Sequence, residues 1–190
     1  MKTKYLIIAF VITALLQAAV PLKMIYDSEM TEKHGTEYRF RTTPIDPTDP
    51  FRGKYITLDF EAEAVTTQDT TWVRNEKVYA SLGKDSLGFA TITNVSREKP
   101  SDKTDYVATK VGYYYGRDLH IDLPFERFYM EESKAYEAET AYREYNLAAV
   151  KFMPAYAIVA VKDGNAVLKN VIIDGIPMKE YVLKQREKSK

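Results

Sequence analysis

The sequence contains no cysteine among its 190 residues. This excludes disulfides, cysteine-ligated metal sites, thiol catalysis and lipid attachment through an N-terminal cysteine. The chain also has no excess of either charge, because 27 lysines and arginines balance 27 aspartates and glutamates. A chain without net charge has no overall field that attracts nucleic acid or acidic ligands, so we expect no nucleic-acid partner. Its two histidines show no zinc-binding spacing such as HExxH.

Long apolar runs are confined to one place, the N-terminal stretch. Two lysines precede the run YLIIAFVITALLQAAV (residues 5–20), whose only polar members are Thr13 and Gln17. A helix from Tyr5 to Tyr26 would rise about 32 Å, enough to cross a hydrocarbon core of roughly 30 Å. The preceding lysines favour a cytoplasmic N-terminus and an extracytoplasmic chain beyond the helix.

A cleaved signal peptide is the alternative interpretation of this stretch. Cleavage requires small residues at positions −3 and −1. A cut after Ala18 would place Leu16 at −3, and a cut after Ala19 would place Gln17 there. Neither residue is small, so the sequence favours an uncleaved anchor. We expect an anchor over residues 1–27 that contacts the membrane through 5–26, a linker over 28–34 and an extracytoplasmic β domain over 35–185.

The part after the anchor contains an internal sequence similarity at a fixed offset, which we call the echo. GFATITNV (88–95) and GNAVLKNV (164–171) share Gly-x-Ala-x-aliphatic-x-Asn-Val at an offset of 76 (164 − 88). PFRGKY (50–55) is similar to PFERFY (124–129) at nearly the same offset. Matches in the same order at one offset indicate a duplication, although strands of like pattern also arise by chance. The echo predicts two pseudo-repeated halves, about 35–110 and 111–185.

Local patterns predict mostly strands. Residues 55–64 alternate between apolar and polar side chains, which is typical of a half-buried antiparallel strand. Residues 77–95 and 157–175 each have the pattern of two strands joined by a glycine-containing turn. Residues 131–146 have helical spacing, although their alternation also permits a strand. The expected fold class is mainly β with minor α: a transmembrane helix, then an antiparallel β domain of two halves with one helix near 131–145.

The strand predicted from residue 55 is preceded by a segment rich in proline and aspartate, and the two together read TTPIDPTDPFRGKYITLDF (42–60). Its three prolines fix φ and bias the preceding residues towards extended backbone. Asp46 and Asp49 are placed to cap backbone N–H groups, and Gly53 permits a positive φ. Arg52 is available to pair with either aspartate. The residues therefore predict a rigid corner that sets the register of the strand, with a ligand or partner site as the alternative.

The layout of this stretch resembles the signature of the GDYXXLXY family of bacterial membrane-anchored proteins. In that family a proline- and aspartate-rich lead enters a Gly-Asp-Tyr-x-x-Leu-x-Tyr strand, and Gly53, Tyr55 and Leu58 match it. Lys54 and Phe60 stand where the family has aspartate and the final tyrosine. The carboxylate of that aspartate is therefore absent from this chain.

The resemblance extends along the chain, through LPFERFYMEE (123–132) to DGNAVLKNVIIDG (163–175). It implies a location at the membrane and a class of partner, because members of the family tend to be associated with polytopic membrane proteins. It implies no chemical activity.

Catalytic and metal-binding patterns are mostly missing. Asp118, His120 and Asp122 fall on one strand face, which a solvated polar face explains as well as a metal patch. The cluster around Glu126 and Glu131 contains carboxylates that suit acid and base catalysis. Ion pairs at a strand end and an acidic first helical turn explain the same residues. A type I signal peptidase would need Ser-Met-x-Pro and Gly-Asp-Asn-Arg, and both are absent.

We therefore expect a single-pass, membrane-anchored extracytoplasmic accessory or interaction protein, binding a polytopic membrane partner or acting in the cell envelope. The first alternative is a small-ligand sensor that uses a cleft between the two halves, and the second is a divergent hydrolase. No enzyme activity, cofactor or metal is expected. The candidate structural or partner-binding residues are Asp46, Asp49, Arg52, Gly53, Tyr55, Leu58, Glu126, Arg127, Tyr129 and Glu131.

Overall fold

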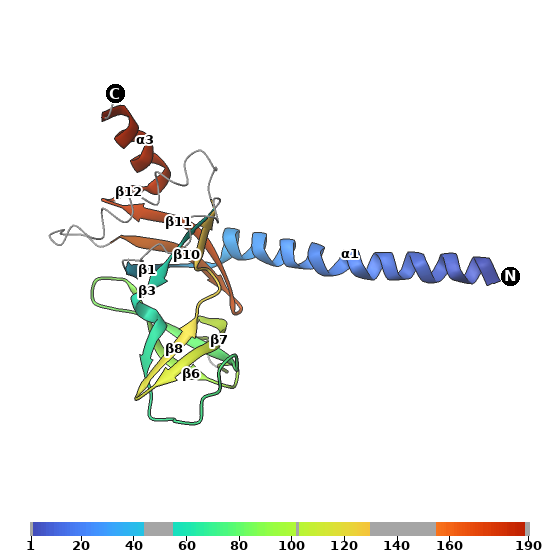
Figure 1. The fold of residues 1–190 in the computed structure, drawn as a ribbon, viewed down its shortest axis with the longest axis horizontal. Coiled ribbons are helices and arrows are strands. Elements are labelled where there is room, and N and C mark those ends of the chain that lie inside the picture. Colours follow the sequence, from blue (N-terminus) through green and yellow to red (C-terminus); the bar gives the residue numbers. More distant parts are fainter. Residues whose placement is uncertain (1, 44–54, 102, 130–154, 189–190) are drawn as a thin grey trace.

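A computed structural model describes residues 2–43, 55–101, 103–129 and 155–188. It consists of a long helix, α1 (Lys2–His34), that projects from a β-rich body (Figure 1). Among the described residues α1 is the one helix long and apolar enough to span a membrane, and the protein covers none of its apolar window. This agrees with the predicted anchor.

The helix continues through residues 28–34, where a linker was expected. Two ion pairs at i,i+4 spacing support this polar end, Lys23 with Asp27 and Lys33 with Glu29. Such pairs each stabilise a helix by a few tenths of a kcal/mol. The polar end of α1 also packs on the β body, which stabilises it further.

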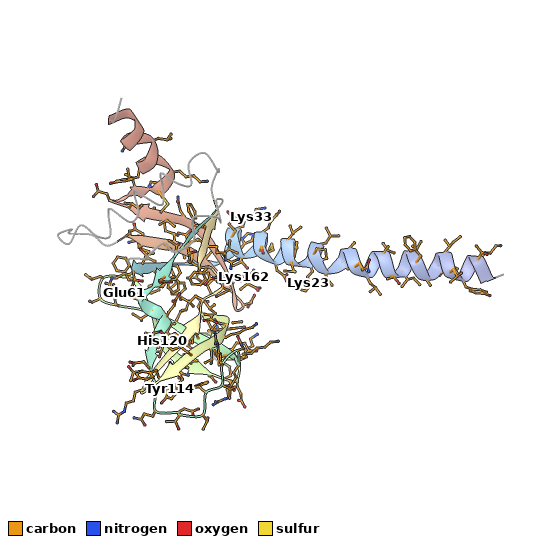
Figure 2. All side chains as sticks on the ribbon, in the orientation of Figure 1. Lys23, Lys33, Glu61, Tyr114, His120 and Lys162 are labelled. Atoms are coloured by element: carbon orange, nitrogen blue, oxygen red, sulfur yellow. The ribbon has the colours of Figure 1, made fainter. Side chains whose placement is uncertain are left out.

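The joint between α1 and the β body is formed at Gly35. Its N–H donates to the Thr31 carbonyl at 2.8 Å, and Thr31 is 1% exposed. A Cβ atom on residue 35 would lie 2.5 Å from the Thr31 oxygen and 2.9 Å from the Val161 oxygen. Lys33 and Lys162 lie at this joint (Figure 2). Only glycine allows the helix end and the sheet to approach so closely.

We expect Gly35→Ala to lower the stability of the full chain by about 1–3 kcal/mol, because the helix end or β10 must shift to admit the methyl group. Thermal melting in detergent measures the effect. The matched control is Ser28→Ala, on an exposed side of the same helix. A variant at residue 35 that melts together with this control would show that the joint is not tightly packed.

Two five-stranded antiparallel sheets form the β body (Figure 1). The first sheet has the order β12 (Ile176–Pro177), β11 (Asn165–Ile173), β10 (Tyr156–Lys162), β1 (Thr36–Thr43) and β3 (Asp59–Phe60). The second sheet has the order β4 (Ala64–Thr66), β8 (Asp118–Asp122), β7 (Tyr106–Tyr115), β5 (Lys77–Lys84) and β6 (Ala90–Ser96). A two-stranded ribbon is formed by β2 (Tyr55–Thr57) and β9 (Arg127–Tyr129).

Residues 55–64 do not form the single strand that their alternation predicts. They contain β2, β3, the 3-10 turn η1 (Glu61–Glu63) and the first residue of β4. The turn carries the chain out of the first sheet and into the second, which a continuous strand would not allow. The predicted alternation of burial is present, because Leu58 and Phe60 are buried and Thr57 and Asp59 are exposed. The alternating residues nevertheless belong to two strands with different partners, since β2 pairs with β9 and β3 pairs with β1.

Both predicted hairpins are present, β5–β6 and β10–β11. The second turns at Asp163 and Gly164, whose φ angles are 51° and 87°, as a tight hairpin turn requires. Each hairpin contains a bulge, with Thr93 and Lys169 as the extra residues. These two residues lie 76 positions apart (169 − 93), which is the offset of the sequence echo.

The predicted halves do not form separate sheets. The first sheet combines β1 and β3 with β10–β12, and β7 runs across the boundary at 110/111. Each hairpin turn also contacts the other sheet: Arg41 of β1 pairs with Asp85 at 2.6 Å, and the Ala108 N–H donates to the Gly164 carbonyl at 2.9 Å. The two parts are therefore intertwined, and the duplication itself stays a prediction.

Of the described residues, 178–188 form a helix that the sequence analysis did not predict. This helix, α3 (Met178–Lys188), begins directly after Pro177, and Met178 is fully buried against the body. Proline before a helix and Glu180 in its first turn were available signals. The helix predicted near 131–145 lies outside the described residues.

Candidate functional site

The two motif segments pair with each other. β2 and β9 are antiparallel, with Tyr55 opposite Tyr129 and Thr57 opposite Arg127. Directly after β2, the Leu58 N–H donates to the Glu126 carbonyl at 2.7 Å. Two segments that the sequence analysis treated as an echo are thus physical neighbours, and they form one candidate site, which we call the motif ribbon (residues 55–58 and 126–129).

Beneath the motif ribbon lies an aromatic core. Leu58 is 0% exposed, as predicted, and Phe60 is 3% exposed. The rings of Phe40, Phe60 and Phe125 contact one another with centroid distances of 4.9 to 5.8 Å. Such ring pairs add about 0.5–1.5 kcal/mol each beyond the area that they bury. The phenylalanine at the family's final tyrosine position suits this dry packing, since it has no hydroxyl group that needs a partner.

Four acidic side chains gather beside the motif ribbon, from β3, η1, the end of β8 and the segment before β9. Burial, together with the neighbouring carboxylates of Asp59, Glu126 and Asp122, raises the pKa of Glu63 in η1 to about 8. The Glu63 carboxyl is therefore mainly protonated at neutral pH. Figure 2 labels its neighbour Glu61, which lies where the chain passes between the sheets and pairs with Arg41 at 3.7 Å. The sequence analysis missed Glu63, because its environment depends on contacts between distant segments.

The remaining predicted site residues are only partly described. Glu126 and Arg127 are exposed and form an ion pair at 3.5 Å, as strand-end pairing predicts. The backbones of Tyr55 and Tyr129 face each other in the ribbon. The other predicted residues lie outside the described ranges, namely Asp46, Asp49, Arg52, Gly53 and Glu131. The rigid corner at 44–54 and the pairing of Arg52 with an aspartate therefore stay predictions.

The polar face around His120 has the predicted alternation on β8. Asp118 and Asp122 are exposed, and Leu119 and Ile121 point into the core. The ring of His120 stacks on the ring of Tyr113, with the ring centroids 4.1 Å apart. Figure 2 labels His120 and Tyr114, the residue that follows Tyr113. Among the described residues, no group of three histidine, aspartate or glutamate side chains is arranged to hold a metal ion. The exposed aspartates and the ring stack are consistent with a solvated polar face.

The comparisons with known proteins agree with the motif. A family model described as GDYXXLXY protein matches residues 17–171, which include both segments of the motif ribbon, the β5–β6 hairpin and all but the last two residues of the β10–β11 hairpin. No curated protein and no solved structure matches the chain. No function is assigned to the family. Because the match covers most of the sequence, the chain belongs to the GDYXXLXY family.

Proposed function

We propose that this protein is a membrane-anchored accessory protein whose β domain lies outside the cytoplasm and binds a polytopic membrane protein. The observation that carries the proposal is the unbroken helix from the apolar span into the β body. α1 continues as helix to His34, and Gly35 then fits against Thr31 and Val161 without room for a side chain. The anchor and the β domain are therefore held in one orientation.

The length of the polar end places the β domain close to the bilayer. The eight residues from Asp27 to His34 rise about 12 Å beyond the aromatic Tyr26. The headgroup layer on each side of a bilayer is roughly 5–8 Å thick. The domain thus begins a few ångströms above the headgroups, within reach of the short external loops of a membrane protein.

The described part of the motif also fits an interaction protein. Leu58, Phe60 and Phe125 pack the interior, while Thr57, Glu126 and Arg127 are presented at the surface. This arrangement builds a fixed surface from two distant segments. The resemblance described above implies a polytopic partner for such a surface.

The absence of cysteine makes the topology directly testable, since each engineered cysteine is the only thiol. We expect Leu87→Cys, at a 71% exposed turn position of the β domain, to react with a membrane-impermeant maleimide in intact cells. Thr3→Cys should react only after permeabilisation, because the lysines around it favour the cytoplasmic side. The cysteine-free parent is the control. Labelling in the opposite order would refute the proposed orientation, and release of the protein at alkaline pH would refute the anchor.

A further inference from the structure

Gln17 places an amide group near the middle of the apolar span. Tyr5 and Tyr26 mark the two interfacial ends of the span, and Gln17 lies about 2 Å from the midpoint between them. Its side chain has two N–H donors and one carbonyl acceptor and no hydrogen-bond partner among the described residues. In hydrocarbon no water is present to satisfy these groups, so they favour contact with another helix.

A second polar group at the same position lacks its usual hydrogen-bond donor. Pro21 stands four residues after Gln17 inside α1. Proline has no N–H, so it cannot donate the bond that the Gln17 carbonyl normally accepts. Residue 17 therefore presents a backbone acceptor that lacks its usual i+4 donor beside its unpaired side-chain amide, at one depth in the bilayer.

The other polar residue of the span does not need a partner. The Thr13 hydroxyl donates to the Ala9 carbonyl at 2.9 Å, within the same helix. Thr13 and Gln17 lie on the same side of α1, since they are four residues apart. Of the two polar side chains in the apolar run, Gln17 is therefore the one without a hydrogen-bond partner within α1.

The β domain covers the same side of the helix. Thr31 is the one buried side chain among those described in α1, and it follows Thr13 by 18 residues (31 − 13), which is about five full turns. α1 contacts β10 and β11 at this end. The β domain therefore covers the Thr31 end of the side of the helix from which Gln17 projects.

This contact at Thr31 selects the occupant. In a pair of α1 helices joined through Gln17, both β domains would lie over the space between two axes only about 8–10 Å apart. A domain roughly 30 Å wide does not fit there twice. A helix from a protein with a short external loop does fit, because it ends at the membrane surface beneath the domain.

We propose that the Gln17 side of α1 binds a transmembrane helix of a polytopic membrane protein, which hydrogen-bonds the side-chain amide and the backbone carbonyl of Gln17. This inference rests on the proposed function and adds the contact that the partner makes inside the bilayer. The partner helix supplies at least one polar side chain at mid-depth and a short connection on the external side.

The test is photocrosslinking of the full chain in its native membranes. A photoreactive amino acid at Phe10 or Val20, on the Gln17 side, should form one discrete adduct with a protein that has several transmembrane helices. The same amino acid at Val11 or Leu22, on the opposite side, should not. Gln17→Leu should lower the adduct yield about threefold to twentyfold, the range for interhelical hydrogen bonds. Thr13→Val is the matched control and should leave the yield unchanged.

Pro21→Ala provides an independent variant, because it restores a donor to the Gln17 carbonyl and should lower the yield by less than Gln17→Leu does. Adducts of two copies of this chain, equal yields on both sides of the helix, adducts with lipid alone, or no effect of Gln17→Leu would each overturn the inference. In all four outcomes the anchor would still resist alkaline extraction. Release at alkaline pH would instead mean that the proposed function itself fails.

Discussion

Leu58→Ala is expected to lower the free energy of unfolding by about 2–5 kcal/mol. Leu58 is fully buried where the chain leaves β2 and enters β3, and it belongs to the same hydrophobic core as the three phenylalanines. Removing its side chain leaves a cavity that the surrounding core can fill only by moving. Such a loss is a large share of the roughly 5–15 kcal/mol that stabilises a typical domain.

Thermal or denaturant unfolding of the full chain in detergent measures this loss. Thr57→Ala is the matched control, because the neighbouring side chain is exposed and its replacement should change stability by less than about 0.5 kcal/mol. If Leu58→Ala unfolds together with the Thr57 variant, the motif leucine does not hold the motif ribbon on the core. The leucine of the family signature would then have to act at the protein surface.

Leu58 was predictable because its signal is local. Alternation over a few residues marks a buried position whatever the strand pairs with, and the same holds for the turn at Asp163 and Gly164. The apolar span was predictable for a similar reason, since composition and length alone decide whether a helix suits a bilayer. In each case the physical cause lies within about 20 residues of sequence.

The motif ribbon was not predictable in this way. β2 and β9 pair across 74 positions (129 − 55), and the similarity of the two segments suggested equivalent places in two halves. Similar strands can instead pair with each other, because pairing depends on the path of the whole chain. The break of residues 55–64 at η1 has the same origin, since the alternation does not record which sheet a residue joins.

Charge networks between distant segments were also beyond the sequence analysis. Arg97 bonds Asp69 at 2.7 Å and Glu76 at 2.6 Å, and its guanidinium lies 4.2 Å from the ring centre of Trp72. These contacts order the long connection between β4 and β5. No spacing rule connects residues 21 and 28 positions apart in irregular structure. The carboxylates around Glu63 form the same kind of arrangement, with opposite consequences for stability.

Glu63 should make the protein less stable as the pH rises from about 4.5 to about 8. The pKa of its carboxyl is raised from 4.5 to about 8 in the folded chain, first by burial and then by Asp59, Glu126 and Asp122. Below pH 4.5 both folded and unfolded chains hold the proton, so the group has no effect. Between the two values the unfolded chain releases the proton and the folded chain keeps it, so stability falls.

We expect Glu63→Gln to remove this dependence, because the amide has nearly the same size and no charge. The two proteins should melt alike at pH 4, and the variant should be more stable by about 2–3 kcal/mol at pH 8.5. This is roughly half of what the full pKa shift implies, because water reaches part of the side chain. Melting curves across this pH range measure the difference, with the exposed Glu98→Gln as control. Parallel curves for parent and Glu63→Gln would show that the carboxylates around Glu63 do not destabilise the junction of the two sheets.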